Sequence, residues 1–115
     1  MNDESHDCHR IDPPNTDWWT SEILAVLKSP GDFFWLRDGA GEITDIIIRI
    51  PGDEGGTIAP IPVNHGQATQ NPARWGWDGN EEKPTLQPSI WRNQGLPSHR
   101  NEWHGHLQAG RLVSC

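Results

Sequence analysis

The closing stretch of the chain, Trp103-His104-Gly105-His106-Leu107-Gln108-Ala109-Gly110-Arg111-Leu112-Val113-Ser114-Cys115, predicts a β-hairpin. A two-residue loop at 109–110 suits the tight turns that join antiparallel strands. The pairs then run outward from Gln108 with Arg111 to His104 with Cys115. Opposed residues in such a ladder have Cβ atoms roughly 4.5–5.5 Å apart. A three-residue loop would shift every pair by one position.

Outward from the hairpin, most of the chain also predicts β structure. The strand of residues 42–50 is the longest, and its Ile46-Ile47-Ile48 run indicates burial on both faces and a central place in a sheet. Pro60 ends a short strand at 57–59, and Pro62 confines the residues after it to an edge strand or a loop. We expect an irregular connection at 64–74. Further strands are predicted at residues 33–37, 74–77 and 86–91, the last broken at Pro88.

One helix is predicted, over residues 17–28, with Asp17 as its N-cap and Ser29-Pro30-Gly31 as its stop. Its apolar residues recur at helical spacing. The expected fold class is therefore α+β and mostly β. We expect a small antiparallel sheet or sandwich with one N-terminal helix and the C-terminal hairpin. Residues 1–16 are expected to be a flexible N-terminal tail, and residues 17–115 a single β-rich domain.

The composition is acidic and rich in tryptophan. The 115 residues carry a formal net charge of -7, and seven are tryptophans, most of which we expect in the core. Such a chain lacks the clustered cations that direct nucleic-acid binding requires, and it favours a protein partner with a basic surface. No hydrophobic span is present, so we expect no membrane association and a cytoplasmic location. A disulfide between Cys8 and Cys115 is disfavoured there.

A metal site is the chemistry that the hairpin suggests. If His104 and Cys115 face each other across the ladder, an imidazole and a thiolate can share one ion. His65, followed by a glycine that permits a tight turn, is the expected third ligand. Zinc accepts such a set and keeps a fourth position open. His106 is a further candidate ligand because it shares a face with His104.

Two catalytic alternatives stay open at this point. Cys115 could act as a nucleophile with His104 as its base, but no third group that would orient the base is evident. A metal-dependent hydrolase would need a general base, and Glu102 is the nearest candidate, although no carboxylate has a spacing typical of catalysis. The residues alone do not decide whether the chain is an enzyme, and they favour a binding role.

One segment carries a family resemblance. Residues 75–90, Trp-Gly-Trp-Asp-Gly-Asn-Glu-Glu-Lys-Pro-Thr-Leu-Gln-Pro-Ser-Ile, contain W-x-W-x-G and then P-T-L-x-P-S-I, and His104, Gly110 and Cys115 come after them as His-x5-Gly-x4-Cys. This pattern resembles an uncharacterised family of small phage and prophage proteins, over about residues 57–115. Some members are similar to proteins encoded beside bacterial ubiquitin-like conjugation genes. In many relatives a cysteine-rich segment precedes the W-x-W motif, and the resemblance carries its ligand role only onto His65. We expect the P-T-L-x-P-S-I element to be scaffold, with Leu86 and Ile90 pointing inward.

The resulting expectation is a phage-encoded accessory protein that acts by binding and is stabilised by a structural zinc ion. One alternative is an acidic inhibitor of a host defence protein or of a nucleic-acid-binding protein. The other is the metal-dependent hydrolase.

Overall fold

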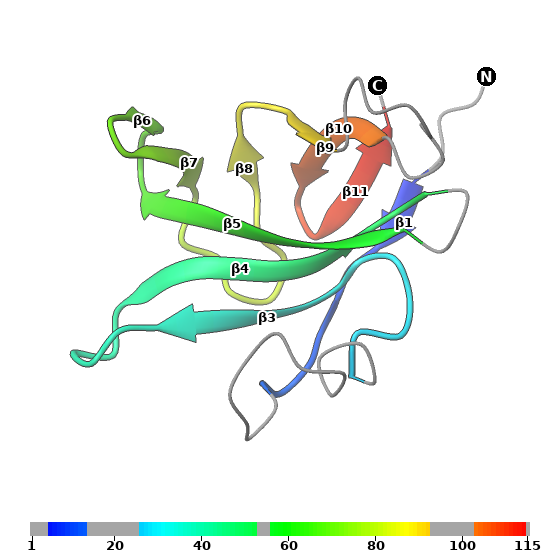
Figure 1. Ribbon diagram of the computed structural model, residues 1–115, viewed down its shortest axis with the longest axis horizontal. Helices are drawn as coiled ribbons and strands as arrows, with labels where there is room; N and C mark the ends of the chain where they lie inside the picture. The colour runs from blue at the N-terminus through cyan, green and yellow to red at the C-terminus, as the bar shows by residue number, and fades with distance from the viewer. Residues whose placement is uncertain (1–4, 14–25, 53–55, 93–102, 115) are drawn as a thin grey trace.

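The computed structural model describes residues 5–13, 26–52, 56–92 and 103–114 of the chain, and this part is mostly β (Figure 1). Its strands are β1 (Ser5–Asp7), β2 (His9–Arg10), β3 (Asp32–Arg37), β4 (Ile43–Ile50), β5 (Thr57–His65), β6 (Thr69–Gln70), β7 (Ala73–Trp77), β8 (Leu86–Gln87), β9 (Ile90–Arg92), β10 (Trp103–Gln108) and β11 (Arg111–Ser114).

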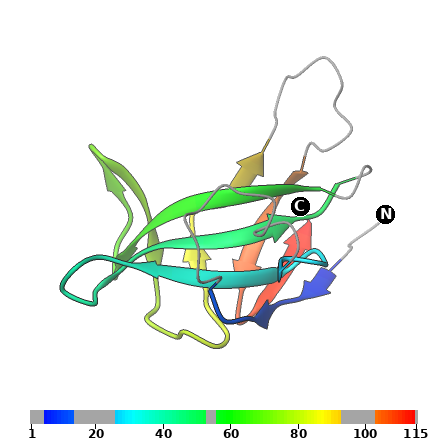
Figure 2. The same cartoon turned by 60° about the horizontal axis from the view of Figure 1, so that its bottom comes forward.

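The strands form two sheets. The smaller sheet has the order β1-β11-β10-β9, and the larger has the order β2-β3-β4-β5-β7-β6, with β8 also paired to β7. Most pairs are antiparallel, whereas β2 with β3 and β5 with β7 are parallel. Figure 2 shows the orange and red strands of the smaller sheet crossing behind the cyan and green strands of the larger one.

The main core lies between these sheets. Strands from both contribute fully buried side chains to it, such as Ile46 and Ile48 from β4 and Leu107 and Leu112 from the closing hairpin. Ile47 points to the opposite face of β4, where it packs in a second cluster with Leu27 and Phe34. The predicted central strand is therefore confirmed, because its three isoleucines are buried on both faces of the sheet.

The closing hairpin has the predicted register. Gln108 pairs with Arg111, and the pairs continue outward to Gly105 with Ser114. The backbone angle φ is +49° at Ala109 and +76° at Gly110, which is the left-handed geometry of a type I′ turn. The alternative three-residue loop is excluded. The outermost expected pair, His104 with Cys115, lies outside the described residues because Cys115 does.

The prediction that the strand ends before Pro60 was wrong. The strand continues through Pro60 and Pro62 to residue 65, and it stays paired with β4 opposite both prolines. The two prolines are two residues apart, so their nitrogens point to the same edge of the strand. On that edge β7 pairs only from Val63 onward, so no ladder bond needs the missing N–H groups. The region after His65 also holds β6 instead of being wholly irregular.

The predicted helix lies mostly outside the described residues, because 14–25 are not described. Of its last three residues, only Val26 has helical geometry, and residues 27 and 28 do not continue it. Apart from Val26, nothing in the described part supports the helical component of the expected α+β class. Among the described residues, no helix has the length and apolarity needed to span a bilayer.

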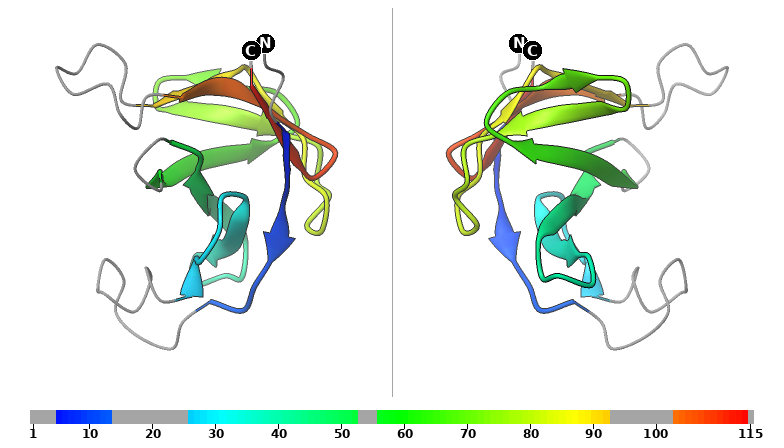
Figure 3. Two further views of the ribbon diagram at one scale, coloured as in Figure 1. Left: turned by 90° about the vertical axis from the view of Figure 1, so that its right-hand side faces the viewer. Right: turned by 90° about the vertical axis from the view of Figure 1, so that its left-hand side faces the viewer.

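The N-terminal strands connect the two sheets. β1 pairs with β11 of the smaller sheet, and β2 pairs with β3 of the larger one. Figure 3 shows this blue segment running from one sheet to the other. Arg10, at its end, forms ion pairs with Glu81 and Glu82. Part of the expected tail over residues 1–16 is therefore built into both sheets.

Cys8 lies between these two strands and packs against the main core. Burial raises the pKa of its thiol from 9.0 to about 12. Between these values the unfolded chain loses the thiol proton while the folded chain keeps it, so stability should fall as pH rises above 9. We expect urea unfolding curves at pH 8 to 11 to show this fall, and a Cys8→Ala variant to show less of it. An equal pH dependence in both proteins would contradict the assignment.

Candidate active site

Ser89 lies where the chain passes from one sheet to the other. β8, just before it, pairs with β7 of the larger sheet, and β9, just after it, pairs with β10 of the smaller sheet. Leu86 and Ile90 are each 1% exposed and point into the core, as predicted for this motif. The half-buried serine between these two anchored strands is therefore held in a defined place.

The segment before Ser89 is also fixed to the closing hairpin. The amide of Ala109 donates to Thr85 Oγ1 at 2.8 Å, and the amide of Gly110 donates to the Pro84 carbonyl at 3.0 Å. The start of the P-T-L-x-P-S-I element, at Pro84 and Thr85, is thus held by structural contacts. Its docking brings Ser89 next to β10, which carries the histidines.

His104 contacts Ser89 directly. Its Nε2 lies 2.9 Å from Ser89 Oγ, within hydrogen-bond distance. The ring also stacks on Trp91, with a distance of 4.8 Å between ring centroids and an angle of 18° between the planes. If Nδ1 carries the proton, Nε2 accepts the hydrogen bond from the serine hydroxyl. This is the relation between a nucleophile and its base that acyl-transfer catalysis requires.

Trp75 holds the backbone of the serine. Its indole Nε1 donates to the Ser89 carbonyl oxygen at 3.2 Å. The first tryptophan of the W-x-W motif is thus bonded to the P-S-I motif. The second, Trp77, is buried and donates to the Asn80 carbonyl at 3.0 Å in the loop that leads to β8.

We expect Trp75→Phe to lower the reactivity of Ser89. The substitution keeps an aromatic ring but removes the N–H, leaving a part-buried carbonyl oxygen without this donor, at a cost of about 1 kcal/mol. The rate of covalent modification at Ser89 should fall roughly threefold to tenfold, since the carbonyl is no longer held. The rate would be measured by labelling with a fluorophosphonate and quenching samples at successive times. A full wild-type rate would show that this bond does not position the serine.

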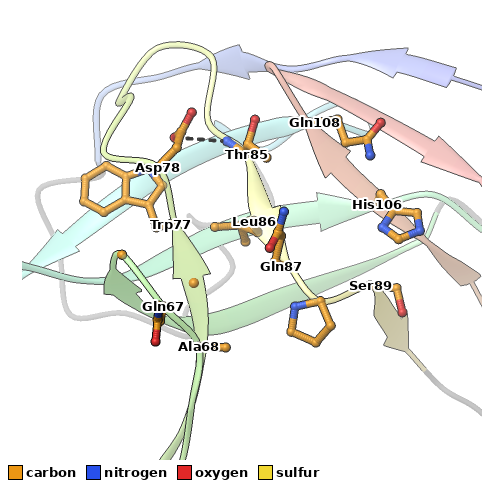
Figure 4. Close-up of a pocket in the computed structure, with 13 residues that line it drawn as sticks. Gln67, Ala68, Trp77, Asp78, Thr85, Leu86, Gln87, Ser89, His106 and Gln108 are labelled. Atoms are coloured by element: carbon orange, nitrogen blue, oxygen red, sulfur yellow. Dashed lines mark hydrogen bonds between the residues drawn. The ribbon is translucent and has the colours of Figure 1, made fainter.

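A pocket of about 890 Å³ opens beside Ser89 (Figure 4). β8 crosses it, His106 and Gln108 of β10 line one side, and Gln67 and Ala68 from the connection between β5 and β6 line another. The serine therefore stands at the edge of a cleft large enough for several residues of an extended peptide. His104 and His106 alternate with buried residues along β10 and share its outer face.

The predicted metal ligands do not come together among the described residues. His65 is on the larger sheet, where its ring lies 5.5 Å from that of Trp77. His104 is on the smaller sheet against Ser89, and His106 lines the pocket. No group of three His, Cys, Asp or Glu side chains suited to a metal is present in the described ranges. Cys115 lies outside them, so the zinc site, like the Cys115 nucleophile, stays a prediction.

Sequence reasoning missed Ser89 as a functional residue. It identified the serine as part of a stiff structural motif and looked for partners of His104 only along the hairpin. A useful signal was nevertheless present, since Ser89 is the serine inside the motif that precedes His104 in the sequence. Ser89 could be connected with His104 only through the pairing of β9 with β10, and no local sequence pattern specifies that pairing.

The fold and the site together define a small β protein with a serine–histidine pair at the edge of a cleft. Residues 27–115 match the model of a protein family described as bacterial ubiquitination-like system serine protease (BubE). Because the match covers well over half of the chain, the chain belongs to the BubE family. This agrees with the expected link to bacterial ubiquitin-like conjugation genes. No curated protein and no solved structure matches the chain significantly.

Proposed function

We propose that the chain is a serine protease of a bacterial ubiquitination-like system, with Ser89 as the nucleophile and His104 as the general base. The observation that carries this proposal is the 2.9 Å distance between His104 Nε2 and Ser89 Oγ at the edge of the pocket. The description of the family supports it independently. Both residues lie within the matched part of the chain.

The proposed reaction is dictated by the two side chains. Ser89 Oγ attacks the carbonyl carbon of the scissile peptide bond while His104 Nε2 accepts the hydroxyl proton. The histidine then gives this proton to the leaving nitrogen, and the C–N bond breaks to leave an acyl-serine. Water, deprotonated by the same Nε2, releases the acid and restores the hydroxyl. No co-reactant other than water is needed.

The pocket is suited to a peptide. Gln67, Gln87 and Gln108 line it, and their amides can both donate to and accept from a peptide backbone. Apolar surface comes from the exposed residues Ala68 and Pro88, so side chains as well as amides of a bound peptide find partners. We place the acyl part of the substrate in this pocket because Ser89 lies at its edge.

The test is covalent labelling of the purified chain with a fluorophosphonate, combined with mapping of the modified residue by mass spectrometry. The proposal expects phosphonylation at Ser89 and at no other serine. Modification that is absent, or that falls equally on several serines, would overturn it. Hydrolysis of an activated ester with and without EDTA separates this proposal from the metal-dependent hydrolase, because chelation should abolish hydrolysis only by the latter.

A phage-encoded binding protein with structural zinc stays a prediction, as does the acidic inhibitor. Neither function requires a reactive serine, so neither predicts that a fluorophosphonate labels Ser89. Elemental analysis of the purified chain, and of the His104→Ala and Cys115→Ser variants, would show whether zinc is bound and whether these residues hold it. A zinc content that both variants retain in full would contradict the ligand set.

A further inference from the structure

Trp91 has an unusual position for a large aromatic residue. Half of its side chain is exposed, although the other described large hydrophobic residues are at least partly buried. In the ladder between β9 and β10, Trp91 is directly opposite His104. Opposed residues on an antiparallel pair point to the same face of the sheet. Their rings accordingly lie face to face, 4.8 Å apart.

A histidine that acts as a base usually has a third group that fixes its ring and stabilises its protonated form. In many serine proteases a carboxylate does this. Within the described ranges, no carboxylate oxygen lies within ion-pair distance of His104; the described ion pair to a histidine is that of His9 with Asp32. The group that contacts the ring of His104 across the ladder is the indole of Trp91.

We propose that Trp91 is a positioning residue for His104, an inference that rests on the proposed protease function. Stacking restricts rotation of the imidazole, so Nε2 stays directed at Ser89 Oγ. When His104 takes the serine proton, its ring becomes a cation above the π face of the indole. Cations within about 6 Å of a tryptophan ring centroid are attracted to that face. Trp91 therefore stabilises the charge that forms during the reaction.

This role can be separated from a role in folding. Trp91 is not among the residues of either core cluster, and half of it is already exposed. Its replacement should therefore leave the two sheets intact. Trp91→Phe keeps a smaller π face over His104, whereas Trp91→Leu keeps apolar bulk but removes the π face. A comparison of the two variants therefore separates the effect of the π face from the effect of apolar bulk.

The experiment is fluorophosphonate inactivation of the full chain, analysed as a maximal rate of inactivation and a half-saturating probe concentration. Trp91→Leu should lower the maximal rate about tenfold, the size of a favourable cation–π contact. The half-saturating concentration should change less than about twofold. Trp91→Phe should recover most of the lost rate. A change confined to the half-saturating concentration would instead mark Trp91 as a substrate contact and overturn the proposal.

A second readout does not depend on reactivity. Nitrogen-15 NMR of the histidine rings should show one fixed tautomer for His104 in the wild type and in Trp91→Phe, and an averaged one in Trp91→Leu. An unchanged fixed tautomer together with a wild-type rate in Trp91→Leu would refute the positioning role. That result would leave Ser89 and His104 as the catalytic pair, whereas loss of labelling at Ser89 in the wild type would refute the proposed function itself.

Discussion

Ser89→Ala should abolish covalent modification and hydrolysis by this chain, and His104→Gln should lower the rate by about a thousandfold or more. The alanine removes the attacking oxygen, and the glutamine cannot accept the proton that the serine must lose. Because each step needs both groups, the double variant should be scarcely slower than either single variant. Rates of inactivation by a fluorophosphonate, and of hydrolysis of an activated ester, would measure these effects.

The matched control is Ser5→Ala. Ser5 is also an exposed serine of the smaller sheet, but its hydroxyl accepts from Arg111, and β11 lies between its strand and the β10 strand of His104. This variant should react at the wild-type rate. Thermal unfolding of each variant would show that Ser89→Ala is folded, since the half-buried Ser89 side chain contributes little apolar packing. Retained reactivity in a folded Ser89→Ala protein would contradict the assignment of the nucleophile.

Gly105→Ala should strongly destabilise the protein. Gly105 lies between the two histidines of β10 and faces the core, where a Cβ atom would be 2.4 Å from Trp103 Cζ2 and 2.4 Å from the Val113 carbonyl oxygen. Neither atom can move easily, because Trp103 is buried and donates to Ser114 Oγ, and the carbonyl belongs to the β11 backbone. We expect a loss of about 3 kcal/mol in the free energy of unfolding, at the upper end for overpacking.

Gly39→Ala is the control for that substitution. It adds the same methyl group in the turn after β3, where no atom lies within 4 Å of the new Cβ and φ is not positive. Its effect on stability should stay within about 0.5 kcal/mol. Urea denaturation of the two variants beside the wild type would compare them. Equal stabilities would mean that β10 and β11 accommodate a side chain at residue 105 by shifting apart.

Local patterns in the sequence predicted much of the fold. The hairpin register was evident from one turn dipeptide, and the central place of β4 from three adjacent isoleucines. Both features depend on neighbouring residues in the chain, and such features can be read locally. The break at Pro88 was also predicted, because proline lacks the donor that a continuous ladder needs.

The site could not be read in the same way. His104 was singled out as a metal ligand with its partner on the neighbouring hairpin strand, whereas its contact in the structure is Ser89. The serine meets the histidine because β9 pairs with the other side of β10, and that choice of neighbour is a tertiary one. The course of β5 through two prolines is a similar case, because it depends on which edge of the strand stays unpaired.

The pairing of β1 with β11 has a consequence for how the protein reaches its native state. During synthesis, the first described strand leaves the ribosome long before its partner, which begins at residue 111. Contacts so distant in sequence close slowly, because the intervening chain must lose entropy before they form. The smaller sheet cannot be completed until the chain has been synthesised through β11. A nascent chain stalled before β10 would therefore contain Ser89 but not His104, and the contact between them could not form.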